Sequence, residues 1–301
     1  MIKRKIVIKV PVAKWSNAHL WGDYHFALAI KKQFERKNWK VLIQIYPEWN
    51  TKDDSSYDVV IVLRGLQRYM PKRNHFNIMW NISHPDDVMV EEYNNYDYVF
   101  IASNIWAEHI SSLCDVKVEA MLQCTDSGLF YLEESMKYKH ELLFIGNSRK
   151  VFRKIIKDIL PTNRDLSVYG TCWNEFINKK YIKGRYISNK ELRKVYSSCK
   201  ILLNDHWDDM RKKGFLSNRL FDGYASGAFI ISDNIKGYKE VFGDALVTYK
   251  TKEELDSLIE KYLKNEILRK EKARKGYEIV NRKHTFKKRV ERIIEVIERN
   301  I

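Results

Sequence analysis

The chain has 301 residues, of which 45% are hydrophobic and 31% charged, and its formal net charge is +15. This composition excludes extensive disorder, and the length suits two domains of about 150 residues each. The positive charge would attract nucleic acid, an anionic membrane face or a phosphorylated small molecule. Charge alone does not distinguish these three kinds of partner. The four cysteines lack metal-ligand spacing, so neither a metal site nor a disulfide framework is expected.

The N-terminus predicts a first strand rather than a signal peptide, because Lys9 and Lys14 interrupt its apolar run. No stretch approaches the roughly 20 apolar residues that span a bilayer. We therefore expect a cytoplasmic protein that would meet a membrane only peripherally, at its inner face.

Short apolar runs rich in β-branched residues alternate with longer amphipathic segments along the whole chain. Such runs are typical of parallel strands buried on both faces. They predict strands at Ile6–Val10, Val41–Tyr46, Val59–Leu63, Tyr98–Ala102, Leu142–Ile145, Leu166–Tyr169, Ile201–Leu203, Phe229–Ser232 and Ala245–Tyr249. The segments between them carry helical spacing, as at Phe26, Ile30 and Phe34. The alternation predicts a doubly wound α/β architecture.

A polar stretch, Ser127–His140, separates the two halves of this pattern. A new strand begins directly after it, so we place a domain boundary near residue 137. The expected organisation is a domain at 1–136, a second at 137–282, and a final basic helix at 283–301. An apolar stripe on that helix predicts packing against the first domain, with docking to anionic lipid as the alternative.

The strongest local motif is residues 214–233, where a helix begins near Leu216–Asn218 and a buried strand follows it. Free N–H groups at the helix start and the guanidinium of Arg219 suit a pyrophosphate. Asp222, one turn beyond Asn218, could accept both hydroxyls of a ribose. The alternative is an ordinary helix with a surface Arg–Asp pair.

Three other predicted strands in this half also end in polar or glycine-rich turns, the positions where open α/β sheets bind ligands. The turn after residue 144 contains Gly146, and the helix that follows it carries arginines, although no G-x-G-x-x-G fingerprint is present. An ordinary structural turn would explain this spacing equally well. The candidate residues in these turns are Asn147, Arg149, Arg153, Tyr169, Gly170, Trp173 and Asn204.

In the N-terminal half, Asp23 and His25 flank a predicted helix start, and His84 lies in a polar cluster, Ser83–Asp87. Each of the three is a candidate general base. Helix capping is the alternative for Asp23, and an ordinary structural role is the alternative for the histidines.

Taken in order, these motifs resemble glycosyltransferases of the spore-maturation (CgeB-like) type, which belong to the GT-B group with two Rossmann-like domains. The resemblance covers about residues 141–297. It rests on FIGN at 144–147, VYG-x-x-W at 168–173, ILLND at 201–205, SNRLFD at 217–222 with ASGA at 225–228, and HTF at 284–286. The pieces WGDYHFA, SHPDD, FIAS and QCTD look like the acceptor domain of such proteins.

The resemblance implies a nucleotide-sugar donor bound against the C-terminal domain without a metal or other cofactor. Arg219 with the amides of Ser217 and Asn218 would hold the pyrophosphate, and Asp222 would hold the ribose where the family usually has Glu. The phosphate pocket would be lined by Asn147 and Arg153. Tyr169 and Trp173 would lie near the base.

One departure concerns the mechanism. Many retaining enzymes of this architecture have two Glu separated by seven residues, and here those positions hold Gly214 and Asp222. An inverting displacement is therefore favoured, with a base in the N-terminal domain. Asp23 is the first choice, followed by His25 and His84.

The expected activity is transfer of a hexose or deoxyhexose to a hydroxyl of a cell-surface polysaccharide, glycolipid or protein. The alternatives are a sugar-nucleotide epimerase on the same scaffold, a basic nucleic-acid-binding protein, and an inactive scaffold. No nucleic-acid-binding module is visible in the sequence, so nucleic acid is not an expected partner.

Overall fold

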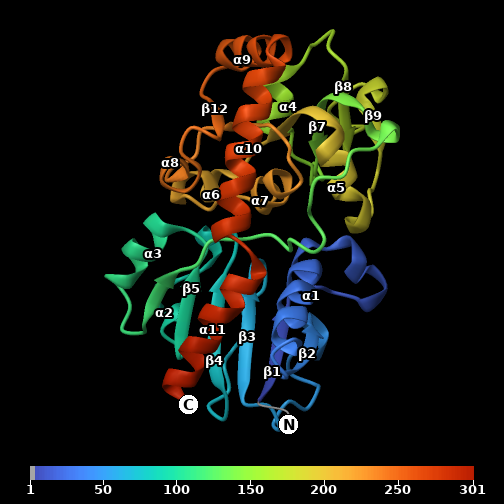
Figure 1. The fold of residues 1–301 in the computed structure, drawn as a ribbon. Helices are drawn as coiled ribbons and strands as arrows, with labels where there is room; N and C mark the ends of the chain where they lie inside the picture. The colour runs from blue at the N-terminus through green and yellow to red at the C-terminus, as the bar shows by residue number, and fades with distance from the viewer. Residues whose placement is uncertain (1–3) are drawn as a thin grey trace. The chain divides into compact units, whose positions relative to one another are not determined.

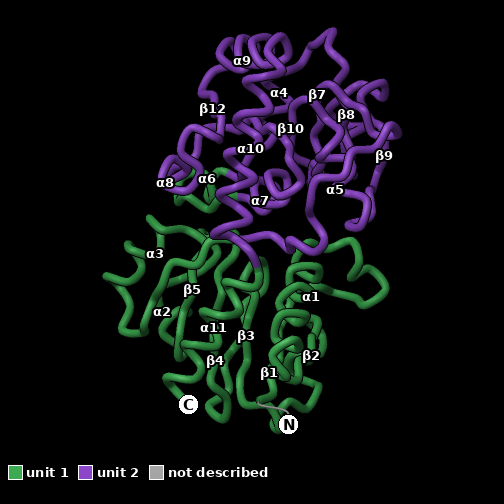
Figure 2. Tube along the Cα trace, viewed as in Figure 1, with its two compact units in different colours: residues 1–123, 208–216, 286–301 green, residues 124–207, 217–285 purple. Residues whose placement is uncertain are grey.

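The computed structural model describes residues 4–301, which divide into two compact units (Figure 2). The first unit comprises the chain up to Gln123 together with Asp208–Leu216 and Phe286–Ile301. The second comprises Cys124–Trp207 and Ser217–Thr285. Each unit contains one parallel six-stranded sheet with helices packed on it, so the predicted α/β architecture with two Rossmann-like domains is confirmed (Figure 1).

The sheet of the first unit has the strand order β2-β1-β3-β4-β5-β6. Its strands are β1 (Lys5–Val10), β2 (Lys40–Ile45), β3 (Val59–Arg64), β4 (Phe76–Asn81), β5 (Tyr98–Ile101) and β6 (Val118–Ala120). Its helices are α1 (Gly22–Glu35), α2 (Val90–Tyr93), α3 (Asn104–Ser111), α6 (Asp208–Lys213) and α11 (Phe286–Asn300). The central strands β1 and β3 are buried almost throughout, which explains their nearly continuous apolar sequence.

The final helix, α11, belongs to the first unit and packs against α1. Its apolar stripe, which includes Val290, Ile293 and Ile297, is buried. The Phe286 ring meets Phe26 of α1 edge-on, with 4.6 Å between ring centroids. The predicted packing of the last helix on the N-terminal domain is therefore observed, and its apolar face is not available to a lipid.

The sheet of the second unit has the order β12-β11-β10-β7-β8-β9. Its strands are β7 (His140–Ile145), β8 (Leu166–Tyr169), β9 (Ile182–Gly184), β10 (Cys199–Asn204), β11 (Ile230–Asp233) and β12 (Val247–Tyr249). Its helices are α4 (Lys154–Ile159), α5 (Asn189–Ser198), α7 (Asn218–Ala225), α8 (Tyr238–Phe242), α9 (Lys252–Lys264) and α10 (Glu266–Lys283). The strands β7, β8 and β10 end side by side at the carboxyl edge of this sheet.

The structure contains three strands that the sequence pattern did not predict: β4, β6 and β9. In β4, Asn77 and Asn81 interrupt the apolar run although both are buried. The Asn77 side chain donates to the carbonyl of His75 at 2.8 Å, and Asn81 donates to the carbonyl of Arg64 at 3.1 Å. These bonds satisfy the donor groups of both side chains inside the unit. The other two strands have only three residues each.

The unit boundaries differ from the expected 136/137 and 282/283. Residues 124–136 belong to the second unit because hydrogen bonds tie them there. The Thr125 N–H donates to the His284 carbonyl at 3.0 Å, and the Glu133 N–H donates to Ser197 Oγ at 3.0 Å. Among residues 4–301, no helix is long and apolar enough to cross a membrane.

Candidate active site

The site is built at the carboxyl edge of the second unit's sheet, where the turns after β7 and β8 are bonded to each other. Asn147 Oδ1 accepts the Thr171 N–H at 2.9 Å. The Ser148 N–H donates to the Thr171 carbonyl at 3.0 Å. Trp173 Nε1 donates to the Gly146 carbonyl at 2.8 Å. These bonds fix the shape of the two loops before any ligand is bound.

Gly170 is the residue on which this loop pair depends most. Its φ is +143°, a conformation that residues with a side chain rarely adopt. A Cβ at this position would lie 2.2 Å from the carbonyl oxygen of Gly146. The Gly170 N–H also donates to the Gly184 carbonyl at 2.9 Å, which holds the backbone in place.

We expect Gly170→Ala to destabilise the protein by about 2–4 kcal/mol, because the new methyl group overlaps backbone and strains φ. A loss of roughly 5 °C or more in Tm is expected, measurable by calorimetry. Gly22→Ala is the matched control, since a Cβ there meets nothing within 4 Å. Equal Tm values for the two variants would contradict the strain at Gly170.

Asn204, at the end of β10, organises the centre of the site. Its side chain is fully buried, and Nδ2 donates to Ser232 Oγ at 2.9 Å. Its Oδ1 accepts two bonds, from Ser217 Oγ at 2.8 Å and from Arg219 Nη1 at 2.6 Å. One buried amide therefore joins two strand ends to the first turn of α7.

A second buried chain of polar groups holds the start of α7. The backbone N–H of Ser217 points at His206 Nε2, 3.1 Å away. Because a backbone amide can only donate, Nε2 must be the accepting nitrogen and the ring proton is on Nδ1. That nitrogen lies 2.6 Å from Asp233 Oδ1, and the interaction keeps the pKa of Asp233 low despite the burial that opposes ionisation. Asp233 therefore orients His206, which orients the helix start.

Arg219 has an unusual environment for a cation. Its guanidinium lies over the Phe144 ring, 5.0 Å from the centroid, and against the Gly146 turn. Burial lowers the pKa of Arg219. Within residues 4–301, no carboxylate lies within salt-bridge distance of this guanidinium. Desolvated charges are ordinarily paired, so this one is suited to a ligand anion.

Asp222, one turn further along α7, already has two donors. Thr125 Oγ1 donates to Oδ1 at 2.7 Å, and Asn218 Nδ2 donates to Oδ2 at 2.6 Å. Burial raises the pKa of Asp222 to about 8, although these two hydrogen bonds oppose the shift. The Oδ1 of Asn218 is buried with no hydrogen-bond partner in the part of the chain that the structure describes.

Arg153 was expected to line the phosphate pocket, but in the structure its charge is paired with a protein carboxylate. Its guanidinium forms a buried ion pair with Asp205, with Nε 3.2 Å from Oδ2. It also lies under the Trp207 ring, 4.5 Å from the centroid. Arg149 reaches the same ring from further away, at 5.8 Å, and is exposed. Its φ is positive, at 54°.

The two aromatic residues expected near a base are turned elsewhere. Trp173 is 1% exposed and packs edge-on against Phe144 in the core, so it cannot stack on a base without core rearrangement. The Tyr169 hydroxyl lies 3.2 Å from His140 Nε2, and His140 is at the opposite, amino end of β7. The Ser217 amide, expected at a phosphate, instead bonds to His206 as described above.

The three candidate bases all lie in the first unit. Asp23 and His25 are in the first turn of α1, which follows β1, and the helix N-cap is Trp21 rather than Asp23. His25 Nε2 lies 2.8 Å from the His19 carbonyl and therefore donates, which leaves Nδ1 as its basic nitrogen. His84 follows β4 with a left-handed backbone, and its Nδ1 lies 4.0 Å from Asp209 of α6.

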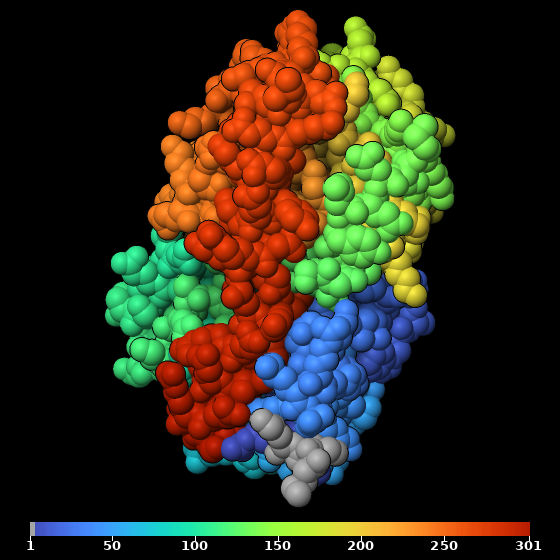
Figure 3. All heavy atoms as spheres, viewed as in Figure 1, coloured from blue at the N-terminus to red at the C-terminus, as the bar shows by residue number. Residues whose placement is uncertain are grey.

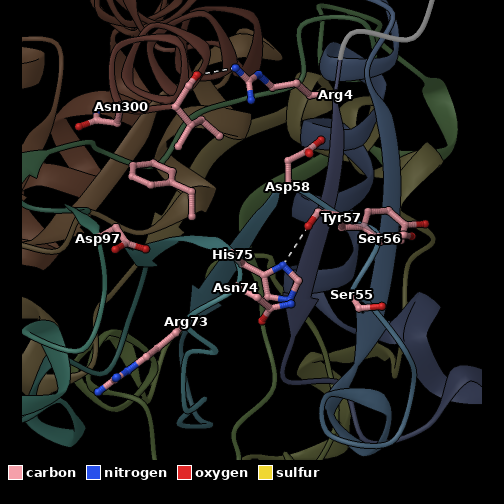
Figure 4. A pocket seen from close by; sticks show the side chains of 12 residues that line it. Arg4, Ser55, Ser56, Tyr57, Asp58, Arg73, Asn74, His75, Asp97 and Asn300 are labelled. Atoms are coloured by element: carbon pink, nitrogen blue, oxygen red, sulfur yellow. Dashed lines mark hydrogen bonds between the residues drawn. The ribbon is translucent and has the colours of Figure 1, made fainter.

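A cavity of about 810 Å³ also opens in the first unit, at the amino ends of β1, β3 and β4 (Figure 4). Its polar groups are bonded to neighbouring backbone: Arg4 donates to the Ile301 carbonyl at 2.5 Å, and His75 Nδ1 lies 2.9 Å from the Tyr57 carbonyl. Parallel sheets bind ligands at the carboxyl edge, so we assign this cavity no part in catalysis.

Several solved structures have the same fold. Sucrose-phosphate synthase from Thermosynechococcus elongatus is similar, with a TM-score of 0.73, 10% identity, and 99% of both chains covered. Anabaena Alr3699/HepE, solved with UDP and glucose, has a TM-score of 0.69, 10% identity, and 98% of this chain and 100% of that chain covered. T4 phage BGT, solved with its UDP-glucose substrate, has a TM-score of 0.63, 15% identity, and coverage of 92% and 94%.

The fold therefore defines a two-domain protein of the GT-B type. Residues 149–295, which contain α7 and the strand ends described above, match the family described as "Glycosyl transferase-like". No curated protein sequence matches this chain significantly. Over these residues the chain is similar to glycosyltransferases, as its motifs predicted.

Proposed function

We propose that this enzyme moves a hexosyl or deoxyhexosyl group from a nucleoside diphosphate sugar to a hydroxyl group, and that the diphosphate binds beside Arg219. The observation that carries the proposal is the desolvated Arg219 guanidinium without a carboxylate partner. A diphosphate would supply the missing charge. The UDP and UDP-glucose bound to Anabaena Alr3699/HepE and T4 phage BGT support a donor of this class.

The start of α7 complements Arg219 in this proposal. The first-turn amides of a helix have no intrahelical acceptor, and they attract anions. The Ser217 amide is bound to His206, which leaves those of Asn218 and Arg219 for the diphosphate. Asn147 and Gly170 would shape the opposite wall. We propose that these groups stabilise the leaving diphosphate without a metal or other cofactor.

The reaction that we propose is an inverting displacement. The acceptor oxygen attacks the anomeric carbon, the bond from that carbon to the diphosphate oxygen breaks, and the acceptor proton passes to a base. The proposed acceptor is a cell-surface polysaccharide, a glycolipid or a protein. Asp23 is the proposed base, because a carboxylate after β1 stands at the carboxyl edge of the first unit's sheet.

Asp23→Asn should lower kcat by at least about 100-fold, the usual contribution of a general base. The affinity for the donor should stay unchanged, because the asparagine keeps the shape of the side chain. His25→Gln and His84→Gln are the comparison variants. Unchanged turnover in Asp23→Asn would remove Asp23 from this role, and a selective loss in one histidine variant would transfer the role to that residue.

The function is tested by calorimetry of the purified protein against UDP, GDP, CDP and TDP and their common sugars, with and without EDTA. We expect saturable binding of one diphosphate that survives EDTA, and release of that diphosphate on addition of an acceptor. Binding that EDTA abolishes would overturn metal independence. No binding of any diphosphate would overturn the donor site itself.

A further inference from the structure

The second unit carries a concentrated basic surface at the β9 edge of its sheet. Residues 179–194 contain seven Lys or Arg and one acidic residue, Glu191. They form a short 3-10 helix at Lys179–Tyr181, the edge strand β9, and the first part of α5. We call this set, together with Lys137 and Lys139, the basic surface.

The members from separate segments are close in space. Figure 1 shows β9 and α5 at the same side of the second unit. The Tyr138 hydroxyl, between Lys137 and Lys139, donates to Glu191 of α5 at 3.3 Å. The positive charge of Lys183, on β9, helps to lower the pKa of His140, although burial is the larger cause. These observations place the segments that carry the cations next to one another.

Most of the charge on this face is not neutralised by the protein. Arg193 and Lys194 pair with carboxylates, Glu133 and Glu191. The other cations of the surface have no carboxylate within 4.0 Å anywhere in residues 4–301. They are exposed, and they are Lys137, Lys139, Lys179, Lys180, Lys183, Arg185 and Lys190.

Protection of an edge strand is the simplest alternative, because exposed lysines discourage pairing between sheets. Only Lys183 lies in β9, however, and the strand has three residues. The other cations are on helices and loops, where no strand edge needs protection. The surface is therefore larger than edge protection requires.

Exposed apolar side chains accompany the cations and indicate which kind of partner fits. Met136 is 78% exposed and directly precedes Lys137, while Leu132 is 59% exposed. Both line a groove of about 1070 Å³ that runs beside α10, and Lys139 lies at the same groove (Figure 3). Apolar groups beside cations suit acyl chains beside anionic headgroups. A nucleic acid or acidic polysaccharide offers no matching apolar partner.

We propose that this face is a docking surface for an anionic lipid bilayer, with the cations at the headgroups and Met136 and Leu132 at the acyl boundary. The surface adjoins the donor site at Gly184, whose carbonyl accepts the Gly170 N–H at 2.9 Å, so the test uses cations outside residues 183–185. The apolar stripe of α11 takes no part, because it is buried against α1.

The test is co-sedimentation of the full chain with vesicles of phosphatidylcholine alone or mixed with phosphatidylglycerol. We expect binding only to the anionic vesicles. Lys137→Glu/Lys179→Glu/Lys180→Glu should weaken it by about 100-fold or more, given the usual contribution of each cation near such a surface. The control, Lys40→Glu/Lys52→Glu/Lys117→Glu, changes net charge equally and should keep binding. Diphosphate affinity should be unchanged in both variants.

Met136→Ser separates a lipid surface from a polyanion. This residue is too exposed to affect folding, so its replacement should weaken vesicle binding while leaving diphosphate binding intact. No preference for anionic vesicles would overturn the proposal. If the control variant lost vesicle binding equally, net charge alone would explain the loss, and the proposal would be overturned as well. Tight binding of an oligonucleotide or heparin, with weak vesicle binding, would assign the surface to a polyanion instead.

Discussion

Replacing Arg219 with alanine is expected to lower the affinity for a nucleoside diphosphate by at least about 30-fold, because a desolvated charge–charge contact of this kind is typically worth about 2–5 kcal/mol. Arg219→Lys should recover only part of the loss, since an ammonium cannot bond to Asn204 and a phosphate with the same fork geometry. The measurement is calorimetric titration of the diphosphate identified in the ligand screen.

The same substitution should not lower the stability of the ligand-free protein. The Arg219 guanidinium is desolvated, and no carboxylate in residues 4–301 lies within salt-bridge distance of it. When the guanidinium is removed, Asn204 Oδ1 still accepts a hydrogen bond from Ser217. We therefore expect an unchanged or slightly higher Tm together with the lost affinity. Arg185→Ala, at an exposed arginine of the same unit, is the control and should bind normally. Unchanged affinity in Arg219→Ala would refute the proposed diphosphate position.

The affinity for the ribonucleoside diphosphate should rise about tenfold between pH 7 and pH 9. Burial raises the pKa of Asp222 to about 8, so this carboxyl group is mostly protonated at pH 7. Ribose hydroxyls donate better to the ionised form, so donor binding should release a proton below pH 8. Calorimetry in two buffers with different ionisation enthalpies counts that proton directly.

Two comparisons identify the source of this pH dependence. Asp222→Asn should show a flat affinity over the same range, because nothing titrates at that position. A 2′,3′-dideoxyribonucleoside diphosphate should also show a flat profile with the unchanged protein. A pH dependence that persists with the dideoxy ligand would mean that Asp222 does not hold the ribose.

The raised pKa also predicts how stability varies with pH. In the unfolded chain Asp222 ionises near 3.8, whereas the folded state keeps its proton to about pH 8. The contribution of Asp222 to the free energy of unfolding is therefore fully present below about pH 4 and is lost as the pH rises towards and through 8. Relative to the unchanged protein, Asp222→Asn should therefore gain about 1–2 kcal/mol of stability at pH 5 and several kcal/mol by pH 8, measurable by denaturant unfolding.

The sequence determined most of the fold, because buried parallel strands need nearly continuous apolar runs and leave a clear pattern. Nine strands follow from it, and the exceptions have physical reasons, as in β4, where buried asparagine side chains donate to backbone carbonyls. The carboxyl-edge placement of Asn204 and Arg219 was also predictable, since the strands of a parallel sheet end on the same side.

Only the tertiary structure decided which partner each polar side chain takes. His206 and Asp233 are 27 residues apart and meet because β10 pairs with β11. Likewise, Arg153 forms an ion pair with Asp205, whereas no carboxylate in residues 4–301 lies within salt-bridge distance of Arg219. A sequence pattern reports burial and spacing along the chain. The direction of a side chain and its competing partners depend on strand pairing, which brings distant residues together.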